Sequence, residues 1–191
     1  MALFALDGVL LSGREKIPEL FFHHPVTNRQ AGPSCRCIPQ ITEPPHVIQP
    51  PTQAVNLLQT IPEIFESLGQ VHGLIDAHGL ERKLHHLVVL RASQINQCGF
   101  CVKMHTREAR EDGESNERLD RLVVWRHVSD FNAAERAALA WTEALTMLRE
   151  DTDFGPLRAA LREHFSEAQI AALTADIGMI NLWNRLQVSR H

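Results

Sequence analysis

From Thr52 to the C-terminus, apolar residues recur every three or four positions, and this spacing is what most limits the folds open to the chain. Residues so spaced share one face of an α-helix. The clearest sets are Leu80, Leu84, Leu87, Val88, Ala92 and Ile95, then Ala137, Ala138, Ala140, Trp141, Ala144, Leu145 and Leu148, then Ile170, Leu173, Ile177, Ile180, Leu182 and Leu186. No stretch alternates apolar and polar residues as a half-exposed strand would. The sequence therefore predicts an all-α domain over residues 52–191.

Short polar signals predict where several of these helices begin and end. Gly113 is expected to end a helix that starts near Cys98, and Ser115 is expected to cap the next one, running through Trp125. Asn or Ser is followed three residues later by Glu or Gln at two further helix starts, Asn132–Glu135 and Ser166–Gln169. Pro62 is compatible only with a helix start or a kink.

The first 51 residues differ in character from the rest. They contain eight of the ten prolines, Pro18, Pro25, Pro33, Pro39, Pro44, Pro45, Pro50 and Pro51. Proline removes backbone donors and blocks helix, so residues 1–51 are predicted to form an irregular extension, an extended or partly disordered arm that is available to pack on a partner subunit. Cys35 and Cys37 lie there with no helix to position an activating group beside them, and we assign them no chemistry.

Composition excludes some partners. The formal net charge is −4 and Lys and Arg are scattered, which argues against nucleic acid and anionic membrane surfaces. No apolar run approaches the roughly 18 residues that would span a bilayer, and residues 1–7 lack a basic signal-peptide start. We expect a cytoplasmic location and no membrane association.

The chemistry of the chain is concentrated at Cys98, Cys101 and His105, which form a CxxCxxxH motif. On a helix the three residues project from one face. A thiol in the first turn of a helix has a lowered pKa, because unpaired N–H groups favour the thiolate. The spacing also permits a disulfide across one turn, and an imidazole at His105 exchanges protons at neutral pH.

Other uses of the motif were weighed. Covalent haem attachment requires a His directly after the second cysteine, where Val102 stands. A thioredoxin-like site requires a preceding strand, whereas Leu84–Ile95 has helical spacing. A zinc site remains open, with His85, His86 and His105 available beside the thiols. Two buried structural thiols with a surface histidine remain open as well.

The segment Leu90–Thr106, LRASQINQCGFCVKMHT, resembles the core motif of the alkyl hydroperoxidase D (AhpD)-like, carboxymuconolactone decarboxylase superfamily. Residues 134–145 and 180–186 resemble later helices of the same family, so the resemblance covers roughly residues 52–188. It implies an all-helical fold that assembles as trimers or hexamers. It also implies a peroxidase that reduces organic hydroperoxides through a cysteine pair.

The resemblance implies a role for each motif residue. Cys101 would attack the peroxide and become a sulfenic acid, Cys98 would resolve it as a disulfide, and His105 would relay protons. A dithiol, such as a lipoyl group or a thioredoxin-like protein, would reduce the disulfide again. No metal or organic cofactor is implied.

One position departs from the family pattern. The family has a relay glutamate twelve residues before the first motif cysteine, and this chain has His86 there. An imidazole, with a pKa of about 6.5 against about 4.3 for Glu, would relay protons with an altered pH profile. His86 is alternatively an inert replacement, or a zinc ligand together with His105. His85 points about 100° away on a helix and is expected to be exposed.

Two further functions stay open: a ring-opening or decarboxylating enzyme acting on a lactone such as carboxymuconolactone, and a zinc-stabilised or redox-sensing binding protein. The dithiol argues against the first. Trp141 and Trp183 are expected to anchor the core or a subunit interface. Asn181, Asn184 and Arg185 belong to a segment that resembles a family helix near the site, and they are candidates for site residues.

Overall fold

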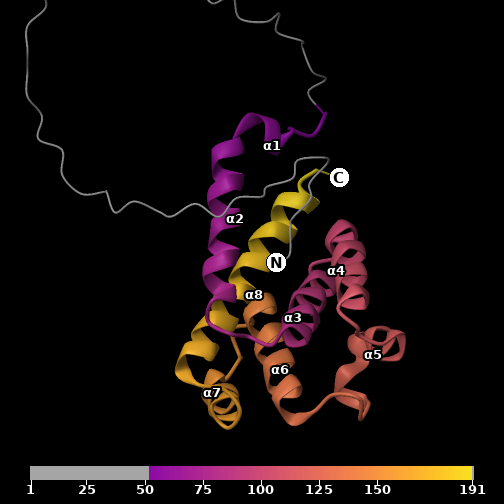
Figure 1. Ribbon diagram of the computed structural model, residues 1–191, viewed down its shortest axis with the longest axis vertical. Coiled ribbons are helices and arrows are strands. Elements are labelled where there is room, and N and C mark those ends of the chain that lie inside the picture. Colours follow the sequence, from indigo (N-terminus) through magenta and orange to yellow (C-terminus); the bar gives the residue numbers. More distant parts are fainter. Residues whose placement is uncertain (1–51, 191) are drawn as a thin grey trace, which may run out of the picture. The chain divides into compact units, whose positions relative to one another are not determined.

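The computed structural model describes residues 52–190, and within that range it contains helices and no strand, as the apolar spacing predicts (Figure 1). The helices are α1 (Leu57–Thr60), α2 (Pro62–Asp76), α3 (Arg82–Ile95), α4 (Gly99–Glu111), α5 (Asn116–Arg121), the 3₁₀ helix η1 (Leu122–His127), α6 (Ala133–Met147), α7 (Phe154–Arg162) and α8 (Glu167–Val188). The predicted proline-rich extension, with Cys35 and Cys37, lies outside the described residues. None of the helices in 52–190 combines the length and the apolar character needed to cross a membrane.

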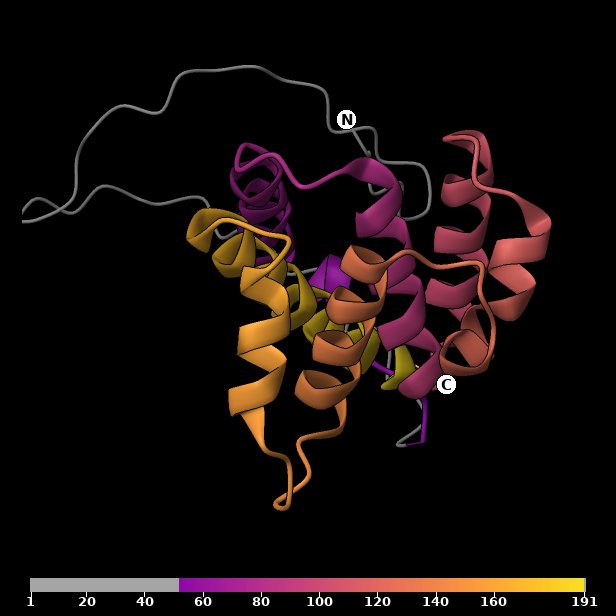
Figure 2. The same ribbon diagram turned by 90° about the horizontal axis from the view of Figure 1, so that it is seen from below.

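Helix α3 lies at the centre of the domain. It packs against α4, α6 and α8, and Figure 2 shows α4 and α6 running along opposite sides of it. Two clusters of buried apolar side chains use α3 as their shared wall. The first comprises Leu87, Leu90, Ala109, Leu119, Leu122, Trp125, Phe131 and Leu139. The second comprises Leu84, Val88, Ala138, Trp141, Leu161, Leu173 and Ile177. A helix buried on several sides is a rigid support for the residues that follow it.

Helix α8 also packs against α2, which lies beside it in Figure 1. Pro62 occupies the first position of α2, where its missing N–H costs no hydrogen bond. The Phe65 and His72 rings pack against Trp183 of α8, with centroids 5.5 and 6.1 Å from the indole. Burial of Trp183 confirms its expected role as a core anchor.

The predicted helix boundaries at local signals are confirmed. Gly113 follows the end of α4 with φ of +81°, and its N–H bonds to the Arg110 carbonyl. The Ser115 side chain accepts a hydrogen bond from the Arg118 N–H at the start of α5. Both predicted capping boxes, Asn132–Glu135 on α6 and Ser166–Gln169 on α8, are present.

The helix predicted to run from Ser115 through Trp125 is wrong in its second half. Helix α5 ends at Arg121, and η1 is interrupted at Val124, with φ of −116° and ψ of 23°. The break allows Trp125 to enter the core and to donate its indole N–H to Glu143 Oε1 of α6, at 2.9 Å. The helical spacing of the apolar residues therefore does not decide the backbone conformation here, because Trp125 bonds to Glu143 of another helix.

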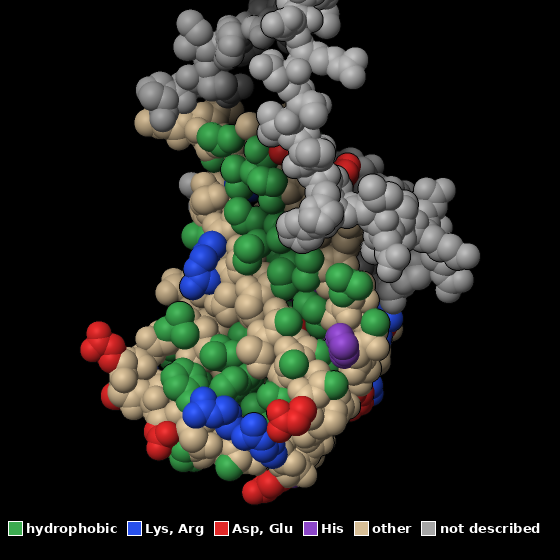
Figure 3. All heavy atoms as spheres, turned by 90° about the vertical axis from the view of Figure 1, so that its left-hand side faces the viewer, with side chains coloured by type: hydrophobic (Ala, Val, Ile, Leu, Met, Phe, Trp, Pro, Cys, Tyr) green, Lys and Arg blue, Asp and Glu red, His purple; other side chains and the backbone are tan. Residues whose placement is uncertain are grey.

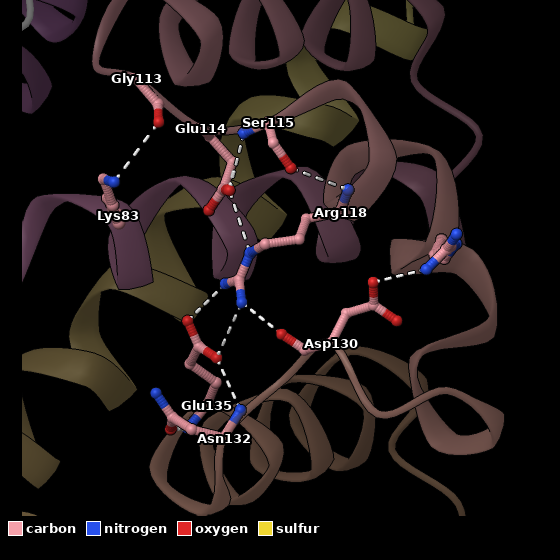
Figure 4. Close-up of polar contacts among 9 residues, drawn as sticks. Lys83, Gly113, Glu114, Ser115, Arg118, Asp130, Asn132 and Glu135 are labelled. Atoms are coloured by element: carbon pink, nitrogen blue, oxygen red, sulfur yellow. Dashed lines mark hydrogen bonds and ion pairs between the residues drawn. The ribbon is translucent and has the colours of Figure 1, made fainter.

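Arg118 of α5 joins three segments (Figure 4). Its Nε donates to Glu114 Oε1 at 3.0 Å, and its guanidinium also contacts the Asp130 carbonyl and the Glu135 carboxylate of α6. Glu114 is 8% exposed, so Arg118 neutralises a carboxylate that is largely removed from water. This contact fixes α5 and the loop before α6 on the C-terminal end of α4.

Candidate active site

The end of α3 places Cys98 at the start of α4. The Cys98 N–H bonds to the Ser93 carbonyl at 3.1 Å, and the Gln97 N–H bonds to the Gln94 carbonyl at 3.2 Å, with Gln97 at φ of 55°. This is the Schellman arrangement that ends many helices. It turns the chain so sharply that Cys98 is already the N-cap of α4, and its Sγ accepts from the Cys101 N–H at 3.4 Å.

The two cysteines are buried and in contact, and no disulfide joins them. Their Sγ atoms lie 2.6 Å apart, and the side chains are 0% and 1% exposed. Covalent disulfides join sulfurs at about 2.05 Å, so a bond between Cys98 and Cys101 needs only a small movement. The structure thus brings together the thiol pair that the motif predicts.

The pKa of Cys101 contradicts the expectation of a thiolate. Burial, and then the hydrogen bond with Cys98, raise the pKa of Cys101 from 9.0 to about 12. A helix N-terminus contributes at most about 2 kcal/mol, equivalent to about 1.5 in pKa, so it does not offset this burial. The resting form of Cys101 is a neutral thiol, and its reaction as a nucleophile requires a base.

His105 is the histidine nearest to the thiols along α4, one turn after Cys101. It is 1% exposed, and its Nδ1 lies 3.0 Å from Glu108 Oε2. Burial raises the pKa of Glu108, but the hydrogen bond and the charge of His105 outweigh it, and the pKa falls below its ordinary value. Sequence reasoning missed Glu108, although Cys101, His105 and Glu108 stand at the i, i+4, i+7 positions of one helix face.

His86 is buried but is held elsewhere. Its Nε2 lies 2.5 Å from Oδ2 of Asp112, the C-cap residue that follows α4. Asp112 is about 16 Å along the helix axis from Cys101, at 1.5 Å per residue. Burial lowers the pKa of His86, although Asp112 acts in the opposite direction. Within residues 52–190 no hydrogen bond joins His86 to either thiol, so no direct contact supports its predicted role as a proton relay.

His85 was expected to be exposed, and this is wrong. Its side chain is only 19% exposed, and Nδ1 lies 2.7 Å from Oδ2 of the buried Asp176 on α8. Burial lowers the pKa of His85, but the hydrogen bond and charge of Asp176 outweigh it and raise the pKa. The rotation of about 100° from His86 points this side chain toward α8 rather than toward solvent.

A polar cluster from α3 and α8 surrounds the cysteines. Asn184 is fully buried, and its Nδ2 donates to Ser93 Oγ at 3.0 Å while its Oδ1 accepts from Asn96 Nδ2 at 2.9 Å. The Asn184 side chain also hydrogen-bonds Cys101, which lowers the thiol pKa against the larger effect of burial. Asn181 accepts from Asn96 at 2.9 Å. Arg185 is exposed, and it contacts this cluster only through the backbone carbonyl and side chain of Asn181.

Trp141 is buried as expected, and its Nε1 donates to Thr174 Oγ1 at 3.0 Å. Among residues 52–190, no three His, Cys, Asp or Glu side chains are grouped so that they could hold a metal ion. The zinc alternative for Cys98, Cys101, His86 and His105 therefore has no geometric support in the described part of the chain.

Comparison with known proteins places this geometry in a family. Residues 62–144, which span α2 to α6, match the model of the carboxymuconolactone decarboxylase family. The uncharacterized protein YdfG of Bacillus subtilis is 30% identical over 138 residues, which cover 72% of this chain and 94% of YdfG. The chain belongs to the carboxymuconolactone decarboxylase family. The AhpD-like resemblance inferred from the motif is confirmed at the level of this superfamily.

Solved structures share the fold. A protein of unknown function from Agrobacterium tumefaciens, described as a candidate antioxidant defence protein AhpD, is 38% identical, with a TM-score of 0.68 over 72% of this chain and 94% of that one. A peroxidase-related protein from Ralstonia eutropha with an alkylhydroperoxidase AhpD core is 24% identical, with a TM-score of 0.58 over 68% and 69% of the two chains. At that identity the second similarity concerns the fold alone.

Proposed function

We propose that this protein is a thiol-dependent peroxidase that reduces organic hydroperoxides in antioxidant defence. The observation that carries the proposal is the thiol pair, with two Sγ atoms 2.6 Å apart at the start of α4 and His105 one turn beyond. Membership in a superfamily with AhpD-type proteins supports it. A lactone decarboxylase has no evident need for two adjacent thiols.

The proposed reaction has two steps on the protein. Cys101 Sγ attacks the distal oxygen of the hydroperoxide, the O–O bond breaks, and the products are Cys101 sulfenic acid and an alcohol. The thiol proton passes to His105 and then to the leaving alkoxide. Cys98 Sγ next attacks the sulfenic sulfur, which forms the disulfide and releases water. Cys101 is assigned the first step because His105 follows it by one helical turn.

The disulfide is reset by a dithiol, which is oxidised to its own disulfide as both cysteines return to thiols. A lipoyl group or a thioredoxin-like protein has the required chemistry. The cycle needs a compartment that keeps thiols reduced, and we propose the cytoplasm.

We also propose that the protein works as a homo-oligomer, a trimer or hexamer. In the described part of the chain, α2 and α8 expose large apolar side chains, namely Ile64, Leu74, Leu182 and Val188. Figure 3 shows apolar side chains gathered on the face that carries α2. Contiguous apolar patches are uncommon on monomers. Sedimentation of the wild type and of Leu74→Asp tests this, with a lower molar mass expected for the variant.

The test of the peroxidase proposal is consumption of cumene hydroperoxide with excess dihydrolipoamide. Turnover is expected in the wild type and is expected to be lost in Cys101→Ser. Cys98→Ser is expected to reduce one equivalent of peroxide and then stop, because the sulfenic acid has no resolving thiol.

The chain offers a matched control in its other cysteine pair. The double variant Cys35→Ser/Cys37→Ser removes the same number of thiols and is expected to keep full turnover. Wild-type protein that consumes no peroxide, or Cys101→Ser protein that keeps turnover, would contradict the proposal.

A further inference from the structure

The contact between His105 and Glu108 determines which ring nitrogen of His105 can accept a proton. An ionised carboxylate only accepts hydrogen bonds, so at 3.0 Å from Glu108 Oε2 the Nδ1 atom must carry the hydrogen. In the neutral imidazole, Nε2 then carries the lone pair.

The surroundings of Glu108 keep it ionised. His85 and His86 face it from α3, and Arg107 and His105 act on it from its own helix. Burial opposes ionisation, but the pKa of Glu108 stays below its ordinary value. The acceptor is therefore present across the neutral pH range.

Glu108 is much less exposed to solvent than Glu111, the next acidic residue on α4. Glu111 is 66% exposed, and its ion pair with Arg107 is 3.6 Å long. Glu108 is 16% exposed, and its histidine partner is 2% exposed in the side chain. A hydrogen bond that two side chains form away from water fixes their orientation, whereas an exposed pair contributes little.

We propose that Glu108 is a positioning residue that holds His105 in its Nδ1–H form, so that the other ring nitrogen serves as the base for the thiol of Cys101. The inference rests on the proposed function for its role in turnover. The step itself is a proton transfer from Cys101 Sγ to His105 Nε2, with no change of oxidation state.

The test uses the full chain in a Cys98→Ser background, so that modified Cys101 is not resolved by its neighbour. The reagent is methyl methanethiosulfonate, which is small and neutral and reacts with the thiolate. Its rate of reaction with Cys101 is followed by peptide mass spectrometry from pH 6 to pH 9. Nitrogen-15 spectra of the histidine rings report the His105 tautomer in the same samples.

We expect Glu108→Ala to slow the modification of Cys101 by about 10- to 100-fold and to abolish the predominance of the Nδ1–H tautomer, by analogy with lost orienting partners elsewhere. Glu108→Gln keeps an acceptor oxygen but lacks the charge, so an intermediate rate is expected. Glu111→Gln is the matched control, with a rate within about twofold of the parent, because exposed ion pairs contribute little.

A rate and a tautomer population in Glu108→Ala that match those of Glu111→Gln would overturn the inference. Because this reagent contains no peroxide, the result does not depend on turnover. Absence of peroxide consumption in the wild type would contradict the proposed function while the effect of Glu108 on Cys101 remained measurable.

Discussion

The raised pKa of Cys101 makes a quantitative prediction about pH. A thiol with a pKa of 9.0 is about 10% ionised at pH 8, whereas one with a pKa of about 12 is about 0.01% ionised, a difference of about a thousandfold. The cause is burial, followed by the hydrogen bond with Cys98, and neither persists in the unfolded chain. The folded protein should therefore keep Cys101 protonated well above physiological pH.

The assay is alkylation of Cys101 by iodoacetamide in fully reduced protein, with the alkylated peptide quantified from pH 7 to pH 10.5. In the folded protein the rate is expected to rise about tenfold per pH unit from pH 9 to pH 10.5, where direct ionisation of Cys101 sets the thiolate fraction; at lower pH, proton transfer to His105 adds thiolate in an amount that does not change with pH. The same chain in urea provides the control, where the rate should level off near pH 9. The slope is the decisive quantity, since limited access of the reagent to a buried thiol lowers the rate equally at every pH.

A rate that levels off from about pH 9 to pH 10.5 in the folded protein would refute the reasoning, because it would mean that Cys101 ionises as it does in water. The sign of the linked effect on stability is also fixed. A folded-state pKa raised above the unfolded value stabilises the fold below about pH 9, and this contribution is lost as the pH rises toward 12. The difference in unfolding free energy between wild type and Cys101→Ser should fall over that window.

Three further sets of variants test the fold and the site. Arg118→Met should lower the free energy of unfolding in urea by about 3 kcal/mol, because it leaves buried carboxylates unpaired. Arg121→Met breaks only an exposed pair and should cost under about 1 kcal/mol. Equal losses in the two variants would contradict the burial argument. Gly113→Ala should cost about 1–2 kcal/mol of stability in thermal unfolding, because an added side chain is strained at a φ of +81° although no other atom lies within 4 Å. Gly178→Ala, inside α8 and equally uncrowded, should instead raise stability by about 0.5–1 kcal/mol, because Gly is unfavourable within a helix. Asn184→Leu should cost about 1–3 kcal/mol and slow the alkylation of Cys101, since it removes a buried hydrogen bond to the thiol; an unchanged rate would exclude that contact.

Helix boundaries could be predicted where a local signal sets them. Ser115, Gly113 and the two capping boxes act within one turn, so their neighbours in sequence are also their partners in space. The η1 segment could not be predicted, because the position of Trp125 depends on Glu143, 18 residues later. Local periodicity contains no information about such a partner.

The site residues also divide into those that a local pattern predicts and those whose position depends on tertiary packing. The proximity of Cys98, Cys101 and His105 follows from spacing along one helix, and Glu108 was within reach of the same argument. The pKa of Cys101 was predicted in the wrong direction, because burial depends on how α8 packs over the cysteines. The partner of His86, Asp112, lies 26 residues away and is likewise set by the packing of α3 on α4.

The most direct test of the proposed peroxidase is a single turnover. Reduced protein is mixed with one equivalent of cumene hydroperoxide, and its cysteines are mapped by mass spectrometry with dimedone present to trap sulfenic acid. The account predicts a Cys98–Cys101 disulfide in the wild type and a dimedone adduct on Cys101 in Cys98→Ser. Wild-type thiols that stay reduced would contradict the account. A dimedone adduct on Cys98 in Cys101→Ser, with no adduct on Cys101 in Cys98→Ser, would contradict it as well.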